Sequence, residues 1–309
     1  MTAAWPHHLL GRELSNWKRW GEHDELGTLN FVTPEKRVQA ARLVKTGKVF
    51  DLGIPFDKNG PQPAGKLRMN PVHMMTMLPA DFADTADGMM ATDDMVILGL
   101  QVATQWDSLA HVGYDGLFYN GVAAAAVSHR TGASRNSFDK VVSRLISRGV
   151  LLDIARLQGV GRLDDSYEIT AADLSAAEAK QGVRVEAGDI LMVRTGSIQW
   201  FLEGDRQRFM GGQPGLGLDT ARWLHERSVA AVALDNSVCE ILPSLIPDAR
   251  IPFHQVAIRD MGLTIGEMFN FEDLAGDCAA DGSWECQFCG TGLKITGAVG
   301  SPVTPMAIK

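Results

Sequence analysis

Two amides, a carboxylate and an imidazole follow an apolar stretch that ends near residue 100: they belong to Gln101, Gln105, Asp107 and His111. In a strand, alternate residues point to one face, so Gln101, Gln105 and Asp107 would project together. A turn or short helix beyond them could swing His111 back toward this face. Such a set suits a metal site or a general base. It fits equally a strand with a polar rim, a capping aspartate and a structural histidine.

A second pair of polar residues lies in the last quarter of the chain. His254 and Glu267 are thirteen residues apart and flank the apolar, strand-like segment GLTIG. A histidine and a carboxylate separated by one connection can meet at the ends of neighbouring strands. The alternative is a histidine that is structural, as most lone histidines are.

Four further residues are candidates for substrate contacts: His73, Trp106, Tyr114 and Arg194. Tyr114 follows His111 closely and could orient a substrate oxygen. Arg194 ends a strand, where α/β proteins place ligands, and could pair with a substrate carboxylate. Trp106 could belong to an aromatic wall, and His73 could reach the pocket. Packing, an ion pair or a surface position would explain each of them as well.

The pattern of apolar residues and caps indicates the elements that must position these side chains. An apolar run at 95–107 is the strongest strand signal in the first half of the chain. Helices are expected over 34–47, 170–182 and 271–282. A helix that ends at Gly149 should be followed by a strand over 150–154, and the segment 220–237 should form a helix and then a strand. Further strands are expected over 48–56 and 188–196. Loops are expected over 57–70 and 78–95, the second as a mobile surface segment and possible lid. One mixed α/β domain over 1–309 is the simplest interpretation.

Composition and motifs exclude several classes of protein. The chain has 309 residues and a net charge of −8, from 37 acidic and 29 basic residues, so it is a poor nucleic-acid binder. No run of 18 apolar residues and no signal peptide is visible, so we expect no membrane contact, a cytoplasmic location and free thiols on the four cysteines. GxGxxG, GxxxxGK[ST] and GxSxG are absent, which argues against nucleotide cofactors and against a serine hydrolase.

Taken together, the two polar segments resemble the metal-dependent cyclase family, which contains bacterial kynurenine formamidase and isatin hydrolase. That family carries a HxxxHxDxxxH signature and a later histidine followed by a glutamate in a GxxxxE context. The signature positions are occupied here by Gln101, Gln105, Asp107 and His111, and the later pair by His254 and Glu267. The variant QxxxQxDxxxH resembles the branch that includes trans-dienelactone hydrolases. The resemblance covers nearly the whole chain, and its most specific part is QWDSLAH.

The resemblance implies a swivelling β/β/α-type fold, assembled as a homodimer or homotetramer, and a divalent metal, zinc or manganese. It implies that metal-activated water attacks an amide or ester carbonyl. The metal ligands would be Gln101, Gln105, Asp107, His254 and Glu267. His111 would move a proton, and Glu267 could serve as the base instead of as a ligand.

The two glutamines leave their own role open. An amide oxygen is a weaker ligand than the imidazole that the family uses at these positions. Either one metal is lost, or the metal is harder or held less tightly, or Gln101 and Gln105 bind substrate instead of metal.

The expected activity is therefore hydrolysis of a small lactone, cyclic amide or related acyl substrate. One alternative is an arylformamidase-like hydrolase that acts on a linear N-formyl amide. Another is a non-catalytic protein that binds a small molecule and has kept the fold. The joint presence of Asp107, His111, His254 and Glu267 speaks against this second alternative.

Overall fold

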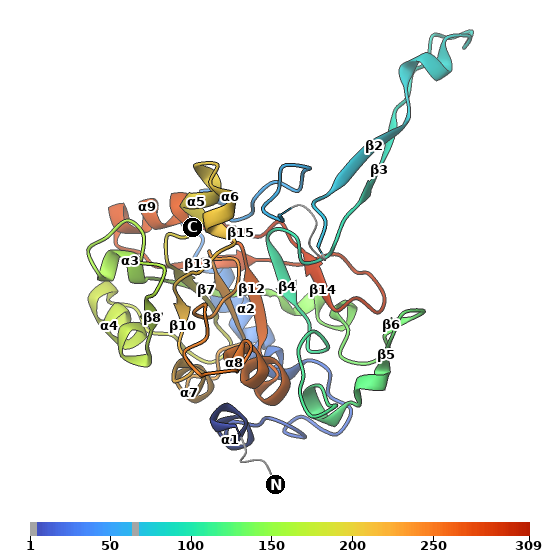
Figure 1. Ribbon diagram of the computed structural model, residues 1–309. Helices are drawn as coiled ribbons and strands as arrows, with labels where there is room; N and C mark the ends of the chain where they lie inside the picture. Colours follow the sequence, from blue (N-terminus) through green and yellow to red (C-terminus); the bar gives the residue numbers. More distant parts are fainter. Residues whose placement is uncertain (1–4, 64–67) are drawn as a thin grey trace.

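The computed structural model describes residues 5–63 and 68–309, and a curled mixed sheet runs through its centre (Figure 1). Within these residues, nine strands lie in the order β1 (Val49–Asp51), β15 (Met306–Ile308), β13 (Glu285–Cys289), β7 (Ile146–Asp153), β9 (Ile190–Arg194), β11 (Ala231–Leu234), β12 (Thr264–Glu267), β4 (Gln105–Asp107) and β14 (Gly300–Pro302). The strands β7, β9, β11 and β12 run parallel to one another, and the remaining pairs are antiparallel. Residues 1–4, and residues 64–67 of the expected loop at 57–70, lie outside the described part.

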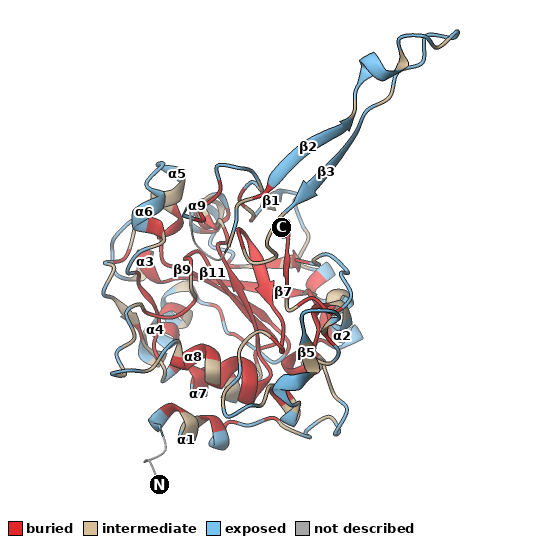
Figure 2. Ribbon diagram, turned by 45° about the vertical axis from the view of Figure 1, so that its right-hand side comes forward, coloured by how far each residue is buried: buried red, intermediate tan, exposed pale blue. Residues whose placement is uncertain are grey.

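The parallel strands β9 and β11 lie in the core because their sequences are mostly apolar on both faces, whereas β12 also carries the buried polar residues Thr264 and Glu267. Every residue of β9, β11 and β12 is buried (Figure 2). A parallel strand that is covered on both sides by other elements requires such a continuous apolar run. The expected strand over 188–196 and the expected single mixed α/β domain are thereby confirmed.

Short and medium helices surround the sheet. Their bounds are α1 Pro6–Glu13, α2 Pro34–Ala41, α3 Ile154–Leu157, α4 Ala171–Gln181, α5 Ile198–Leu202, α6 Arg206–Phe209, α7 Thr220–Glu226, α8 Pro252–His254 and α9 Glu272–Asp281. Helix α2 packs on β7 and β13, α4 packs on β7, α3 and α7, and α1 packs on the π-helix η7 (Gln255–Met261). None of the helices in the described ranges is long and apolar enough to cross a membrane.

Local capping signals place several helix ends where they were expected. The Thr170 side chain accepts a hydrogen bond from the Asp173 backbone, Asp173 returns one, and Gly182 ends α4 in a left-handed conformation. At the start of α2 the Thr33 side chain accepts a hydrogen bond from the Lys36 backbone, without a return bond, and Pro34 occupies the first helical position. Helix α2 stops at Ala41, however, six residues before the expected end.

Two expected elements are wrong. The expected strand over 95–107 is broken into β3 (Asp93–Ile97) and β4 by a turn at 98–104, because Thr104 Oγ1 donates to Met268 O (2.7 Å) and accepts from the Ile54 backbone (2.9 Å). The expected helix before Gly149 is two short 3-10 turns, and the sequence from Ile146 onward already belongs to β7. Pairing with β9 and β13 outweighs the local helical pattern there.

Small two-stranded sheets lie outside the central sheet. They pair β10 (Gly215–Leu216) with β8 (Glu168–Ile169), β5 (Val127–Ser128) with β6 (Gly132–Ala133), and β2 (Val72–Met77) with β3. The β2–β3 hairpin projects away from the body of the molecule and carries the segment expected as a lid at its far end (Figures 1 and 2). That segment therefore does not cover the central sheet.

Candidate metal centre

The sheet register places three of the predicted residues on one face. Strand β4 pairs antiparallel with β12, so Gln105 lies opposite Glu267, and Asp107 lies opposite Ile265. Directly paired residues point to the same side of a sheet, so Gln105, Asp107 and Glu267 share one face. All three are buried, and Gln105 Nε2 donates a 3.0 Å hydrogen bond to Glu267 Oε2.

His254 reaches this face from helix α8, and Glu240 fixes its orientation. The Glu240 carboxylate accepts hydrogen bonds from the backbone N–H groups of Phe253 (3.0 Å) and His254 (2.9 Å). Its Oε1 also lies 2.5 Å from His254 Nδ1. Because the carboxylate occupies Nδ1, the other ring nitrogen is left to face the sheet, as in many metal-binding histidines. That nitrogen, Nε2, lies 3.0 Å from Glu267 Oε1.

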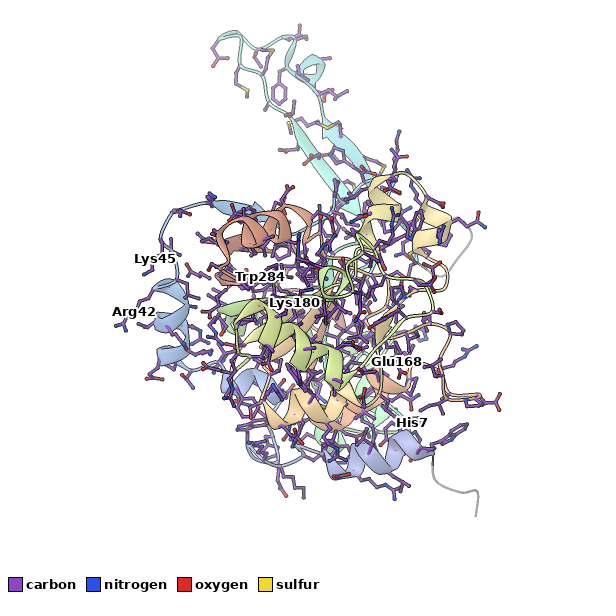
Figure 3. The ribbon with its side chains drawn as sticks, turned by 90° about the vertical axis from the view of Figure 1, so that its left-hand side faces the viewer. His7, Arg42, Lys45, Glu168, Lys180 and Trp284 are labelled. Carbon is purple, nitrogen blue, oxygen red and sulfur yellow. The ribbon has the colours of Figure 1, made fainter. Side chains whose placement is uncertain are left out.

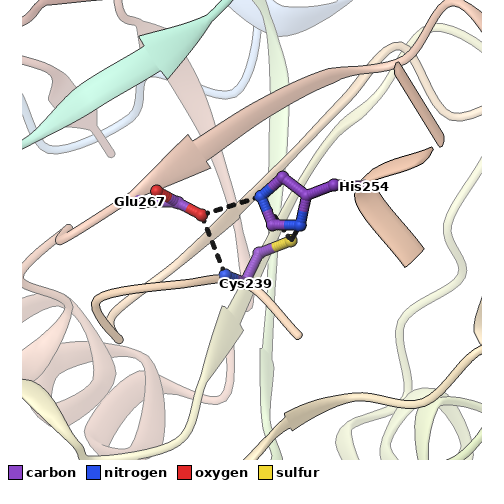
Figure 4. A group of neighbouring side chains, drawn as sticks. All are labelled: Cys239, His254 and Glu267. Atoms are coloured by element: carbon purple, nitrogen blue, oxygen red, sulfur yellow. Dashed lines mark hydrogen bonds and ion pairs between the residues drawn. The ribbon is translucent and has the colours of Figure 1, made fainter. Parts of the chain in front are cut away.

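Cys239 adds a sulfur to the same group (Figure 4). Its Sγ lies 3.9 Å from His254 Nε2, and its backbone N–H donates to Glu267 Oε1 (3.0 Å). One potential ligand atom from each of Cys239, His254 and Glu267 falls within 4.8 Å of the others. Asp107 Oδ2 lies 4.0 Å from His254 Nε2. We call these four residues, Cys239, His254, Glu267 and Asp107, the buried centre.

Unpaired oxygens indicate that the buried centre is suited to a cation. Among the described residues, Asp107 Oδ1 and Gln105 Oε1 are buried and have no hydrogen-bond partner. An unpaired buried polar group costs about 1–3 kcal/mol, so native proteins rarely keep one without a reason. The nitrogen and sulfur donors suit zinc, and the oxygens suit zinc or manganese. The residues present therefore fit a divalent metal ion.

Burial and close contacts shift the ionisation of these groups. Burial raises the pKa of Asp107, and Glu267 adds to the rise. Burial would raise the pKa of Glu267 too, but the hydrogen bond with His254 lowers it. Burial would lower the pKa of His254, yet Cys239, Glu240 and Glu267 together raise it well above its ordinary value. Burial raises the pKa of the Cys239 thiol to about 12. A cation must therefore displace protons from the histidine and the cysteine.

His111 lies at the rim of the buried centre. A turn in which the His111 N–H donates to Ser108 O (3.0 Å) follows β4 directly, so the chain folds back as the sequence suggested. His111 Nε2 ends 3.7 Å from Asp107 Oδ1. Its side chain is 21% exposed, whereas that of Asp107 is 1% exposed. His111 can therefore reach both solvent and the centre.

Gln101 approaches the same face from outside β4. It lies in the turn before the strand, so the expected alternation over four strand positions is not how it gets there. Gly300 of β14 pairs with Asp107, and a Cβ on Gly300 would lie 2.4 Å from Gln101 Nε2. The absence of a side chain on Gly300 thus leaves the space that Gln101 fills beside Asp107.

Trp106 and His73 are not brought to the buried centre. Trp106 lies between Gln105 and Asp107 on β4 and so points to the opposite face, where it packs on Phe269 and donates to Gly290 O. It is fully buried there, so it does not line the buried centre as the sequence suggested. His73 lies on the projecting β2–β3 hairpin and pairs with Asp94 at 2.7 Å, so it does not reach the centre either.

Arg194 and Tyr114 are engaged elsewhere. The Arg194 guanidinium contacts Asp153 (3.0 Å) and Glu272 (2.8 Å), and these ion pairs keep its pKa above the ordinary value in spite of burial. The Tyr114 hydroxyl donates to Asp260 Oδ2 at 2.8 Å. Neither side chain reaches the buried centre: Arg194 lies in an internal ion pair, and Tyr114 lines a separate surface cavity with Arg259 and Asp260. Their contacts with substrate stay a prediction.

Three residues near the centre were not singled out from the sequence: Cys239, Glu240 and Arg68. Cys239 and Glu240 follow β11 in the segment LDNSVCE, just beyond the carboxyl end of a parallel strand. That position is a general signal for ligand binding and could have identified them. Arg68 lies in a region with no element signal, and only the three-dimensional structure brings it to Gln101.

Comparisons with known proteins agree with this architecture. The chain shares 40% sequence identity with a structure described as a novel cyclase, with a TM-score of 0.88 over 96% of this chain and 99% of that one. Isatin hydrolase A from Ralstonia solanacearum is 19% identical, with a TM-score of 0.63 over 85% of this chain and 92% of that one. A predicted metal-dependent hydrolase from Bacillus stearothermophilus is 16% identical, with a TM-score of 0.55 over 85% and 98%. The last two likenesses show a shared fold alone.

A family model described as "Putative cyclase" matches residues 50–240, which include Asp107, His111 and Cys239. No curated protein sequence matches the chain. The expected branch with trans-dienelactone hydrolases finds no support in these comparisons. The match over well over half of the chain, together with the 40% identical structure, shows that the chain belongs to the cyclase family.

Proposed function

We propose that this protein is a metal-dependent hydrolase that opens a small lactone, cyclic amide or related acyl substrate. The observation that carries the proposal is the convergence of Cys239, His254, Glu267 and Asp107 around unpaired buried oxygens. The names of relatives with the same fold, isatin hydrolase and metal-dependent hydrolase, support it.

The residues that would hold the metal are His254 through Nε2, Glu267 and Asp107 through carboxylate oxygens, and Cys239 through its sulfur. A bound divalent ion would polarise the substrate carbonyl and lower the pKa of a bound water. The sulfur of Cys239 favours zinc over manganese. The hydrogen bond from Gln105 Nε2 to Glu267 would orient Glu267 as a metal ligand. The unpaired Oε1 of Gln105 would be available as a further oxygen ligand to the metal.

Glu267 and His111 would take different roles in the reaction, Glu267 as a metal ligand and His111 in proton transfer. Both oxygens of Glu267 are engaged, Oε1 by His254 and the Cys239 N–H, and Oε2 by Gln105. This suits a fixed ligand better than a base that must accept and release protons. His111 is partly exposed, lies beside Asp107 and has no such restraint. We therefore assign proton transfer between the attacking water and the leaving group to His111.

Elemental analysis and a substrate screen test the proposal together. The purified protein should contain a divalent metal, and chelation should abolish hydrolysis in a screen over lactones, cyclic imides and formanilides. Activity on formanilides alone would favour a formamidase instead. Full activity of protein shown to be metal-free would refute the metal-dependent mechanism, and metal without any hydrolysis would favour a binding protein.

A further inference from the structure

A surface cavity of about 230 Å³ lies where the π-helix η7, the end of α1 and the segment after His111 meet. We call it the η7 cavity. It shares no lining residue with the buried centre. Its lining includes Arg12, Trp17, Tyr114, Asp115, Arg259 and Asp260.

The guanidinium of Arg259 borders this cavity with hydrogen-bond donors that the protein does not use. Its side chain is only 9% exposed. Within residues 5–63 and 68–309, Nη1 is the only one of its three nitrogens that has a hydrogen-bond acceptor, namely Asp260 Oδ1. The edge formed by Nε and Nη2 is left without one. Because a buried donor without an acceptor destabilises the folded protein, this edge indicates that an acceptor from outside the chain binds here.

Two aromatic side chains hold the Arg259 guanidinium in place without satisfying that edge. Its Cζ lies 4.6 Å from the centroid of the Trp17 ring and 3.8 Å from that of the Tyr114 ring. Trp17 Nε1 in turn donates to Arg259 O (2.6 Å), which ties the ring to η7. Ring faces attract the charge of a guanidinium, but its N–H bonds lie in its own plane and need acceptors at its edges. The packing therefore fixes the orientation of Arg259 and leaves the donors free.

The charges around the η7 cavity favour a singly charged anion. Both oxygens of Asp260 are engaged, Oδ1 by Arg259 and Oδ2 by the Tyr114 hydroxyl (2.8 Å). Arg12 adds a second positive charge at an exposed position, and Asp115 adds a negative one. The two arginines attract an anion, whereas the Asp115 carboxylate repels a doubly charged one, such as phosphate, more strongly than a singly charged one.

We propose that the η7 cavity is a binding site for a small organic monocarboxylate, which accepts hydrogen bonds from Arg259 and is attracted by Arg12. The fork of Nε and Nη2 matches the two oxygens of a carboxylate. The Trp17 and Tyr114 rings provide apolar walls for the carbon skeleton of the ligand. The inference goes beyond the proposed hydrolase function and does not depend on it, because the cavity and the buried centre share no residue.

Calorimetric titration of the metal-loaded protein with benzoate, neutral benzamide and inorganic phosphate tests the site. Benzoate should bind more tightly than either of the others. Arg259→Gln should weaken benzoate binding by roughly tenfold to a hundredfold, as expected for lost hydrogen bonds to a charged group. Arg12→Gln, at an exposed position, should weaken it by roughly twofold to fivefold.

Asp115→Asn provides a variant with the opposite expected sign. Asp115 has a φ of 51°, a conformation that asparagine also adopts, so the substitution should not disturb the backbone. It removes a repulsive charge and should strengthen the binding of both benzoate and phosphate. Benzamide should respond neither to Asp115→Asn nor to Arg12→Gln. These two variants decide the proposal even if Arg259→Gln does not fold.

The position of the ligand is measured with 4-bromobenzoate, because a metal in the buried centre could also bind a carboxylate. Anomalous scattering from a crystal of the complex should place the bromine in the η7 cavity. The control variant is Arg42→Gln, because Arg42 is exposed and points outward at the end of α2 (Figure 3). It should change no affinity, and metal content should stay constant in every variant.

Three results would overturn the proposal. The first is benzoate binding that is no tighter than that of benzamide or phosphate, or that does not respond to Arg12→Gln and Asp115→Asn. The second is bromine at the buried centre alone. The third is bromine in the cavity without benzoate binding in solution, which would be binding at crystal concentration only.

Discussion

Asp107 and His111 lie four residues apart, yet their surroundings suit Asp107 to metal binding and His111 to proton transfer. Asp107 is sealed into the sheet with one unpaired oxygen, and His111 is at the rim. A buried anion next to a histidine whose orientation Glu240 fixes is a ligand arrangement. A partly exposed imidazole can exchange protons with solvent.

Substitution separates these two roles. Asp107→Ala removes an anionic ligand, so metal content and activity should fall together. His111→Ala should keep most of the metal and lower turnover by roughly a hundredfold or more, in the range typical of general-base losses. Elemental analysis and single-substrate kinetics on the same preparations give both values. If His111→Ala is purified without metal, His111 is a ligand and Glu267 becomes the candidate base.

Gln105 decides how the centre chooses its metal. Its Nε2 bonds Glu267, and its Oε1 is free to face a cation. Gln105→His replaces a weak amide donor with an imidazole and should shift the preference further toward zinc over manganese. Competition between the two ions for the metal-free protein measures the ratio. An unchanged ratio would show that Gln105 serves only to orient Glu267 or to bind substrate.

Metal affinity should depend steeply on pH. The pKa of His254 is raised well above its ordinary value, so the metal-free protein keeps this proton through neutral pH and must release it when a cation binds. Apparent affinity should therefore fall as pH is lowered, by about tenfold per pH unit for each proton displaced. Titration at several pH values checks this. Glu240→Gln removes a carboxylate that raises this pKa and should move the dependence to lower pH, whereas a flat profile would contradict the linkage.

At the scale of elements, the opposite side of β4 holds the centre in register. Gly266 pairs with Trp106 across the β4–β12 ladder, and a Cβ there would lie 2.6 Å from the Trp106 ring and 2.7 Å from Phe269. No side chain larger than hydrogen fits between these strands and the aromatic rings. The packing behind the sheet therefore sets the spacing of Gln105 and Glu267 in front of it.

Gly266→Ala should lower the free energy of unfolding by about 1–3 kcal/mol, the usual cost of overpacking. Gly276, in the middle of α9, is exposed and has open space around it, so Gly276→Ala should instead raise the free energy by up to about 1 kcal/mol through helix propensity. Urea unfolding of both variants provides the comparison. Equal effects of the two substitutions would show that the β4–β12 packing is looser than these contacts indicate.

At the scale of the whole molecule, the β2–β3 hairpin presents an apolar face to solvent. Val72 pairs with Ile97, and Met74 pairs with Met95, so these four side chains share one face, which we call the arm face. All four are exposed, between 39% and 48%. An isolated two-stranded hairpin is marginally stable in water, and an exposed apolar patch marks an interaction site.

The root of the hairpin offers a matching surface. A cavity of about 330 Å³ is lined there by Phe56, Val96, Leu98, Thr291, Gly292, Leu293, Pro302, Val303 and Thr304. A second copy of the chain would place its β2–β3 hairpin against the cavity of the first copy and receive the first copy's hairpin at its own cavity. The two copies would then form a closed, two-fold symmetric dimer. We therefore propose that the protein is a homodimer or homotetramer joined through the arm face.

Light scattering coupled to size-exclusion chromatography should show a dimer or tetramer. The double substitution Met74→Lys and Met95→Glu makes the arm face polar but keeps an attractive cross-strand pair, so it should yield monomers with the hairpin intact. The control, His73→Gln with Asp94→Asn, alters the other face of the hairpin and should leave the assembly unchanged. A monomeric wild type, or a double variant that still assembles, would refute this role of the arm.

Features with a local physical cause were predictable from the sequence. The capping box of Thr170 and Asp173, the apolar run of β9 and the turn that follows Asp107 each depend on residues only a few positions apart. The separation of His254 and Glu267 likewise suggested that the two could meet, and the structure places them 3.0 Å apart. The resemblance to the cyclase family then supplied the expected chemistry.

Tertiary structure decided what no local pattern contains. The break of the expected strand at 95–107 depends on two hydrogen bonds of the Thr104 hydroxyl, which accepts from the Ile54 N–H and donates to the Met268 carbonyl. Trp106 is part of the core and not of a pocket because its neighbours on β4 take the other face. Cys239 and Arg68 reach the centre through contacts with segments far away in the chain. Such contacts follow from strand order and register, which are set by the packing of the whole sheet and leave no mark on the spacing of nearby residues.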